Sequence, residues 1–109
     1  MAYDPKLATR VRQALRRRRE ITEKEQFGGV GFLLRGNMAC GIIGQDLLVR
    51  VGPQGHGAAL KDRHARPFAL TGKPARGWIL VAPGGLRSGP ALQRWVELGL
   101  EFARSLPPK

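Results

Sequence analysis

Residues 27–51, FGGVGFLLRGNMACGIIGQDLLVRV, constrain the fold of this chain more than any other segment. The segment holds three short apolar runs, and each is separated from the next by a turn that contains glycine. Arg35-Gly36-Asn37 is a hairpin turn with residues that tolerate positive φ angles, and Gly44-Gln45-Asp46 is a second short turn. Consecutive strands joined this closely usually pair with one another. The segment therefore predicts an antiparallel meander with strands at 30–34, 38–43 and 47–51.

Helical spacing of apolar residues is found near both ends of the chain. Asp4 and Pro5 form a helix start, and the apolar residues that follow at helical spacing predict a helix over residues 4–18. The arginine run at residues 16–19 closes this helix. A second helix is expected to start near Ser88 or Gly89, with Pro90 in its first turn. The Pro107-Pro108 pair stops this second helix.

Four weaker segments complete the expected architecture. Residues 21–26 have the polar composition of an edge strand or a linker, and residues 57–62 suit a short helix. Two further strands are expected at 68–70 and 77–81. The order of elements predicts an α+β fold with two layers, in which the N- and C-terminal helices pack on one face of an antiparallel sheet of about five strands. A chain of 109 residues is expected to form a single domain over 1–109.

The cysteine count and the N-terminus bear on the compartment. Cys40 is the only cysteine, so it has no partner for an internal disulfide. The N-terminus starts acidic and helical, without the apolar core of a secretory signal. The apolar runs are also much shorter than the roughly 20 residues that span a bilayer. These features together favour a cytoplasmic protein.

Residues that carry chemistry are sparse. The glycines do not have the spacing of a dinucleotide-binding or phosphate-binding loop, so we expect no cofactor. Cys40, His56 and His64 do not have the spacing of metal ligands, so we expect no metal. A small enzyme that uses Cys40 with His64, or another histidine, is one alternative. However, Cys40 lies inside an apolar run, where burial raises the pKa of a thiol and blunts it. We therefore expect no catalytic residues and no enzyme.

The charge balance indicates the class of partner. The formal net charge is +11, from 19 lysines and arginines against 8 acidic residues. A positive field attracts nucleic acid, acidic proteins and anionic surfaces, although exposed arginines can also serve simply to keep a protein soluble. Arg12, Arg16 and Arg19 are spaced four and three residues apart, so they are expected to share one side of the first helix, which suits contact with a phosphate backbone. The candidate nucleic-acid-binding residues are Arg12, Arg16, Arg17, Arg18 and Arg19.

Aromatic residues do not alternate with these arginines, as a base-stacking platform requires. Binding of nucleic acid through them would therefore be electrostatic, weak and nonspecific.

Several motifs resemble the TfoX/Sxy family, specifically its N-terminal domain. They occur in order over almost the whole chain: Phe27-Gly28-Gly29, Gly36-Asn37-Met38, Leu48-Val49-Arg50-Val51, His64-Ala65-Arg66-Pro67, Gly77-Trp78 and Trp95-Val96 with the segment that follows to Pro108. The resemblance implies a two-layer α+β fold with an antiparallel sheet. The best-known members regulate natural competence in bacteria together with a transcription activator, and carry a second, helical domain, so the likeness is to a standalone N-terminal domain. The family supplies no catalytic residues to carry over.

Two functions follow as expectations. The first is a non-enzymatic regulatory module that binds a protein partner, with the transcription machinery as one class of partner. The alternative is a nucleic-acid-binding accessory protein that uses the basic first helix. A homodimer formed through an exposed sheet face or edge is a further expectation, and no membrane partner is expected.

Overall fold

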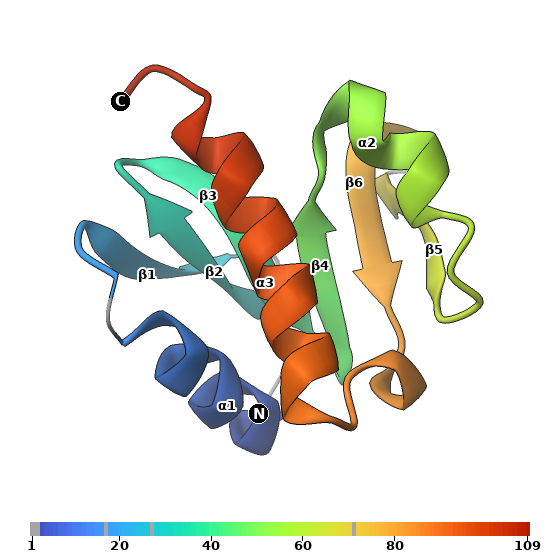
Figure 1. Cartoon of the computed structure of the whole chain (residues 1–109), viewed down its shortest axis with the longest axis horizontal. Helices are drawn as coiled ribbons and strands as arrows, with labels where there is room; N and C mark the ends of the chain where they lie inside the picture. The colour runs from blue at the N-terminus through green and yellow to red at the C-terminus, as the bar shows by residue number, and fades with distance from the viewer. Residues whose placement is uncertain (1–2, 17, 27, 71) are drawn as a thin grey trace.

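A single six-stranded antiparallel sheet forms one layer of the molecule, and helices form the other (Figure 1). The computed structural model describes residues 3–16, 18–26, 28–70 and 72–109. The strands are β1 (Ile21–Gln26), β2 (Gly29–Leu34), β3 (Asn37–Ile43), β4 (Asp46–Arg50), β5 (Ala65–Leu70) and β6 (Lys73–Val81), in the spatial order β1-β2-β3-β4-β6-β5. The helices are α1 (Pro5–Leu15), α2 (Gly52–Ala59) and α3 (Gly89–Arg104), with a 3-10 turn η1 (Pro83–Gly85) before α3. The predicted α+β fold is confirmed.

The predicted meander is confirmed as β2, β3 and β4. Val30 lies opposite Ile42, and Cys40 lies opposite Val49, so the three strands share one register of inward-facing residues. The turn between β2 and β3 has φ angles of 52° at Arg35 and 85° at Gly36. These positive values are the reason why the turn needs a glycine.

The sheet has six strands where about five were expected. The difference is β1, which pairs with β2 along its whole length, from Ile21 opposite Leu34 to Gln26 opposite Gly29. Its polar composition therefore belongs to an edge strand and not to a linker. The strands β5 and β6 are also longer than the predicted segments, because they pair with each other up to the turn that joins them.

The short helix was predicted too late in the chain. It was expected over residues 57–62, but α2 begins at Gly52, which has a φ of 82°. Pro53 follows in the first helical turn, where its missing N–H costs nothing. Gly52 is required for a second reason, since a side chain there would overlap the ring of Phe102.

Helix α1 ends at Leu15 and not at residue 18. Arg16 is its C-cap, and the N–H of Arg18 donates to the carbonyl oxygen of Leu15 in a turn that leads to β1. Leu15 is the last buried residue of the apolar stripe, and the helix ends with it. The prediction that Arg12, Arg16 and Arg19 share one side of a helix is therefore wrong.

The core lies between the helices and one face of the sheet, here called the covered face. Alternate strand residues point into it, and each of those in the central strands is almost wholly inaccessible: Val30, Phe32, Cys40, Ile42, Leu47, Val49, Ile79 and Val81. Helix α3 packs on β3 and β4, and α1 packs beside α3 (Figure 1). The packing is close because position 99 has no side chain: a methyl group on Gly99 would overlap the carbonyl oxygen of Ala39 in β3.

Candidate interaction surface

The other face of the same sheet carries a groove. Because side chains alternate along a strand, the residues between the core positions point to this second face, here called the open face. In the part of the chain that the structure describes, the three helices lie together on the covered side of the sheet (Figure 1). The groove has a volume of about 550 Å³, and every strand of the sheet contributes to its lining: Lys24, Leu33, Gly36, Met38, Leu48, Arg50, Phe68, Ala75, Trp78 and Lys109.

The floor of the groove is apolar. Leu33, Met38 and Trp78 are only partly buried, although they are large hydrophobic residues in the middle of a sheet. Met38 lies over Gly31, where an added methyl group would approach the Met38 Cε to 2.5 Å. The glycine thus lets the methionine lie flat on the sheet, and the floor stays shallow and adaptable.

Cations line the same groove. Lys24, Arg50 and Lys109 come from three distant parts of the sequence. The guanidinium carbon of Arg50 lies 5.0 Å from the centre of the Trp78 ring and 5.3 Å from the centre of the Phe102 ring. Both distances are within the range of a cation–π interaction. Partial burial also lowers the pKa of Arg50 through desolvation of the charge.

The last residues of the chain complete one end of the groove. The backbone N–H of Lys109 donates to the carbonyl oxygen of Arg35 over 2.9 Å. Asn37, a buried polar residue with 2% exposure, donates from Nδ2 to the carbonyl oxygen of Pro107 over 2.9 Å. These two bonds place Lys109 beside the β2–β3 turn. Sequence reasoning missed this contact, since no local signal joins residue 109 to residue 36.

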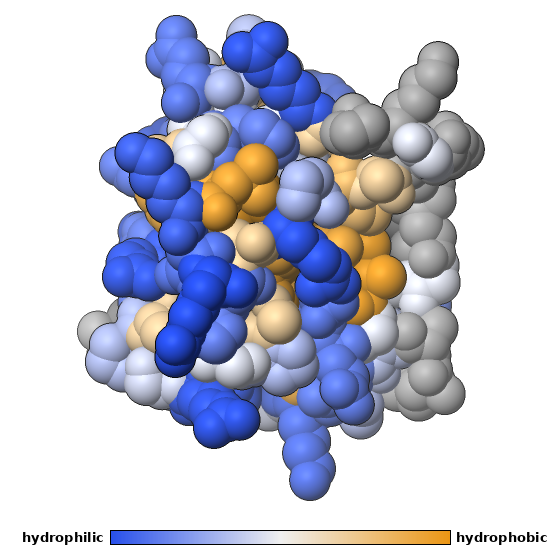
Figure 2. Space-filling model, turned by 90° about the vertical axis from the view of Figure 1, so that its right-hand side faces the viewer, coloured by the Kyte–Doolittle hydropathy of each residue, from blue (hydrophilic) through white to orange (hydrophobic). Residues whose placement is uncertain are grey.

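A neighbouring side of the molecule has a different character. Figure 2 shows the side that carries α2 and β5, where hydrophilic side chains surround smaller apolar patches. Arg66 of β5 is held there by Asp46 of β4, with 2.5 Å between Nη2 and Oδ2. The cations of this side are thus partly paired within the chain, unlike Arg50.

The arginines that the sequence singled out lie around the end of α1. Arg12 donates to both carboxylate oxygens of Glu23, at 2.8 and 2.9 Å, and this pairing raises the pKa of Arg12. Arg18 forms an ion pair with Glu97 of α3. Both pairs are substantially exposed to solvent.

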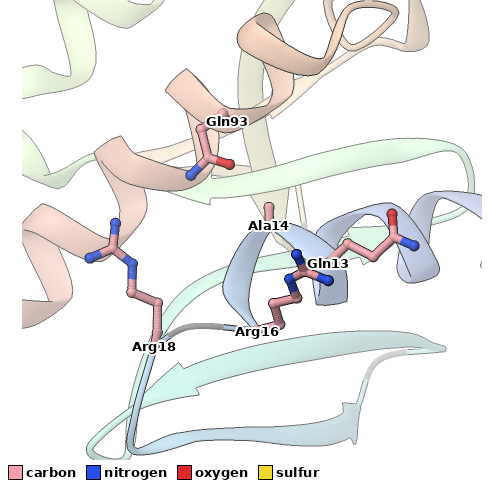
Figure 3. A pocket seen from close by; sticks show the side chains of 5 residues that line it. All are labelled: Gln13, Ala14, Arg16, Arg18 and Gln93. Atoms are coloured by element: carbon pink, nitrogen blue, oxygen red, sulfur yellow. The ribbon is translucent and has the colours of Figure 1, made fainter.

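Two of these arginines share a polar pocket. Its volume is about 420 Å³, and it lies between the end of α1 and the start of α3. Figure 3 shows the lining residues Gln13, Ala14, Arg16, Arg18 and Gln93. Arg19 is exposed, and Arg17 lies outside the described residues.

The structure does not bring Cys40 and a histidine into one site. Cys40 is fully buried on the covered face, and burial raises the pKa of its thiol to about 12. His64 packs against Gly84 and Gly85 of η1. Nδ1 of His56 accepts the backbone N–H of Gly77 over 3.0 Å. Each histidine has a structural neighbour, and the thiol is shielded from any reactant.

The described residues contain neither a metal-ligand cluster nor a membrane-spanning helix. Nowhere in 3–16, 18–26, 28–70 and 72–109 do three or more His, Cys, Asp or Glu side chains gather as metal ligands would. In the same residues, no helix has the length and hydropathy that crossing a bilayer demands.

Comparison with known proteins identifies the family. The family model described as the TfoX N-terminal domain matches residues 13–103, from the end of α1 to the end of α3. No curated protein and no solved structure gives a significant match. The matched family is not a known family of enzymes and is associated with regulation and competence. The match extends over most of the 109 residues, so the chain belongs to the TfoX N-terminal domain family.

Proposed function

We propose that this domain is a regulatory interaction module that binds a protein partner in the groove on the open face of its sheet. The observation that carries the proposal is the groove itself: a partly exposed apolar floor, bordered by cations, on the face opposite the helices of the described residues. Family membership supports a regulatory role rather than catalysis.

The lining has the composition of a binding surface. Aromatic residues, methionine and arginine are enriched in the buried centres of protein interfaces, and the groove contains Trp78, Phe68, Met38 and Arg50. The apolar surface of these side chains that remains in water favours a partner, at roughly 25 cal/mol for each Å² that binding removes from solvent. The groove crosses the strands, so a partner would be held by side chains rather than by addition of a strand at an edge.

A second copy of the chain is a poorer occupant. Each copy carries a net charge of +11, and Lys24, Arg50 and Lys109 of one open face would approach the same cations of the other. Like charges brought together at an interface cost several kcal/mol. A partner with acidic side chains meets no such cost.

Site-specific photo-crosslinking in the native cell tests the proposal. A photoreactive amino acid is placed at Leu33 or Met38 on the open face, and at Leu98 as the matched control. Leu98 is a large hydrophobic residue of α3 with 36% exposure, on the opposite side of the sheet.

The proposal predicts that one protein is cross-linked at positions 33 and 38 and not at position 98. Mass spectrometry identifies the cross-linked segment, and a synthetic copy of that segment binds the purified wild-type domain but not the Leu33→Lys variant. Equal cross-linking at position 98, or equal binding by Leu33→Lys, would contradict the proposal.

The second candidate function is weak binding of nucleic acid by the end of α1. It is favoured by the polar pocket in which Arg16 and Arg18 lie beside two glutamines. It is weakened by the pairing of Arg12 with Glu23 and of Arg18 with Glu97, which removes part of the free positive charge.

Fluorescence anisotropy with labelled duplex DNA and single-stranded RNA tests this candidate. We compare the wild type with an Arg16→Gln/Arg19→Gln double variant and with an Arg87→Gln control, all at two salt concentrations. Binding that falls steeply with salt and is lost only in the double variant would support nucleic acid as the partner. Equal loss in the Arg87→Gln control would mark the binding as a general effect of net charge.

A further inference from the structure

We infer that Arg50 pairs with a carboxylate of the bound partner, and that the partner therefore presents an acidic amphipathic segment to the groove. This inference rests on the proposed function, because it names the chemistry of the partner that the open face binds.

Five arginines of the described residues already have a carboxylate neighbour. The pairs are Arg12–Glu23, Arg18–Glu97, Arg35–Glu20, Arg66–Asp46 and Arg94–Asp62. The arginines of these pairs are each at least 39% exposed. Solvent therefore already stabilises these charges, and the pairs add little to stability.

Arg50 is in the opposite situation. It is less exposed than any of those five arginines, and among the described residues no carboxylate lies within ion-pair distance of it. The nearby groups are the rings of Trp78 and Phe102, which contact the guanidinium through their faces. A charge that has lost part of its water without gaining an anion gains most from a partner that supplies one.

The two rings also confine the guanidinium, whose carbon lies 5.0 Å from the centre of the Trp78 ring and 5.3 Å from that of the Phe102 ring. Its N–H groups form a fork that can bind a carboxylate with two hydrogen bonds. The aromatic contacts restrict the side chain before the partner arrives, so less conformational entropy is lost on binding.

The rest of the groove defines the remainder of the ligand. Leu33, Met38 and Trp78 require apolar side chains opposite them, whereas Lys24 and Lys109 favour further negative charge at the borders. A segment that alternates apolar and acidic side chains, as an amphipathic helix does, satisfies both requirements at once. The phosphates of a nucleic acid would satisfy the cations but leave the aliphatic floor exposed.

Two synthetic amphipathic peptides of 16 residues serve as probes. Both have the same leucine face, and the other face carries glutamate in one peptide and glutamine in the other. Binding is followed by the amide chemical shifts of the ¹⁵N-labelled domain at positions 33, 38, 48 and 78. We compare the wild type, Arg50→Gln, Arg50→Lys and the Arg87→Gln control, which removes one exposed arginine that does not line the groove.

The inference predicts that the glutamate peptide binds the wild type about tenfold or more tightly than the glutamine peptide. Arg50→Gln abolishes this preference, Arg50→Lys retains only part of it because an ammonium lacks the planar fork, and Arg87→Gln retains it. A preference that persists in Arg50→Gln would overturn the inference.

The outcomes separate this inference from the proposed function. If both peptides shift the groove resonances equally, and Leu33→Lys abolishes both, the open face is a protein-binding surface but Arg50 is not its carboxylate site. If neither peptide shifts the groove resonances, both proposals fail. If a labelled oligonucleotide shifts them and the glutamate peptide does not, nucleic acid replaces the acidic segment.

Discussion

The two faces of the sheet are both apolar, but only one of them is closed. On the covered face, Phe32, Val49 and Ile79 have 0–1% exposure. On the open face, Leu33, Met38 and Trp78 come from strands of the same sheet and keep part of their surface in water. Burial of the covered face accounts for the stability of the fold. Folding alone does not explain why the open face is apolar. Exposed apolar residues that gather on one surface are typical of a binding site.

The largest expected difference between the two faces is in the free energy of unfolding. Leu47→Ala on the covered face leaves a cavity in a packed core, so we expect a loss of about 2–5 kcal/mol. The same change at Leu33 removes atoms that already contact solvent, and we expect less than about 1.5 kcal/mol. Urea denaturation of both variants measures the difference. Equal losses would show that the open face contributes to the core as the covered face does.

The close approach of α3 to the covered face gives a second test. Gly99→Ala would force the helix away from the carbonyl oxygen of Ala39, and we expect a loss of about 1–3 kcal/mol. Gly57→Ala in α2 is the matched control, because nothing lies within 4 Å of the added methyl group. There we expect the free energy of unfolding to rise by about 0.4–1 kcal/mol, because replacing glycine by alanine lowers the conformational entropy of the unfolded chain. Thermal unfolding of both variants checks the signs, and a neutral Gly99→Ala would mean that α3 is loosely seated.

The buried thiol predicts how stability depends on pH. In the unfolded chain the thiol of Cys40 ionises near its ordinary pKa of 9.0, whereas in the folded domain the pKa is raised to about 12 by burial. Between these values the unfolded state binds fewer protons than the folded state, so the free energy of unfolding falls as pH rises. Cys40→Ala lacks this contribution. Denaturation of both proteins from pH 8 to 11 should therefore give a steeper decline for the wild type, and parallel curves would contradict full burial of the thiol.

The smallest expected effect concerns the exposed ion pairs near the end of α1. Glu97→Gln removes the partner of Arg18, and the side chains of this pair are 39% and 34% exposed. Solvent screens such a pair, so we expect a change of less than about 1 kcal/mol in the free energy of unfolding. The same urea experiment measures it. A loss comparable to that of Leu47→Ala would show that the ion pair anchors the α1–β1 connection to α3.

Local patterns in the sequence predict the covered face well. The alternation in β2, β3 and β4, and the helical spacing in α3, depend only on near neighbours and on burial. The end of α1 was predicted less well because charge favours a helix C-terminus, while the structure stops the helix where apolar contacts stop, at Leu15. The start of α2 was missed because Gly52 and Pro53 have the composition of a turn.

The open face was not predictable from local patterns. Arg50, Trp78 and Lys109 are far apart in the sequence, and only the strand order β4-β6-β5 and the C-terminal contact with Arg35 place them around one groove. The arginine run was conspicuous because its residues are adjacent, but adjacency says nothing about pairing. Arg18 is already paired with Glu97, whereas the half-buried Arg50 has no carboxylate within ion-pair distance in the described part of the chain.

One measurement tests the separation of the two faces most directly. It is the yield of partner cross-linking from a photoreactive residue at position 38 in the Leu33→Lys variant, together with the urea midpoint of that variant. The account predicts that the midpoint stays near that of the wild type, because the lysine lies on the open face, and that the cross-link is lost. An undiminished cross-link in a stably folded variant would contradict the claim that the open face binds the partner.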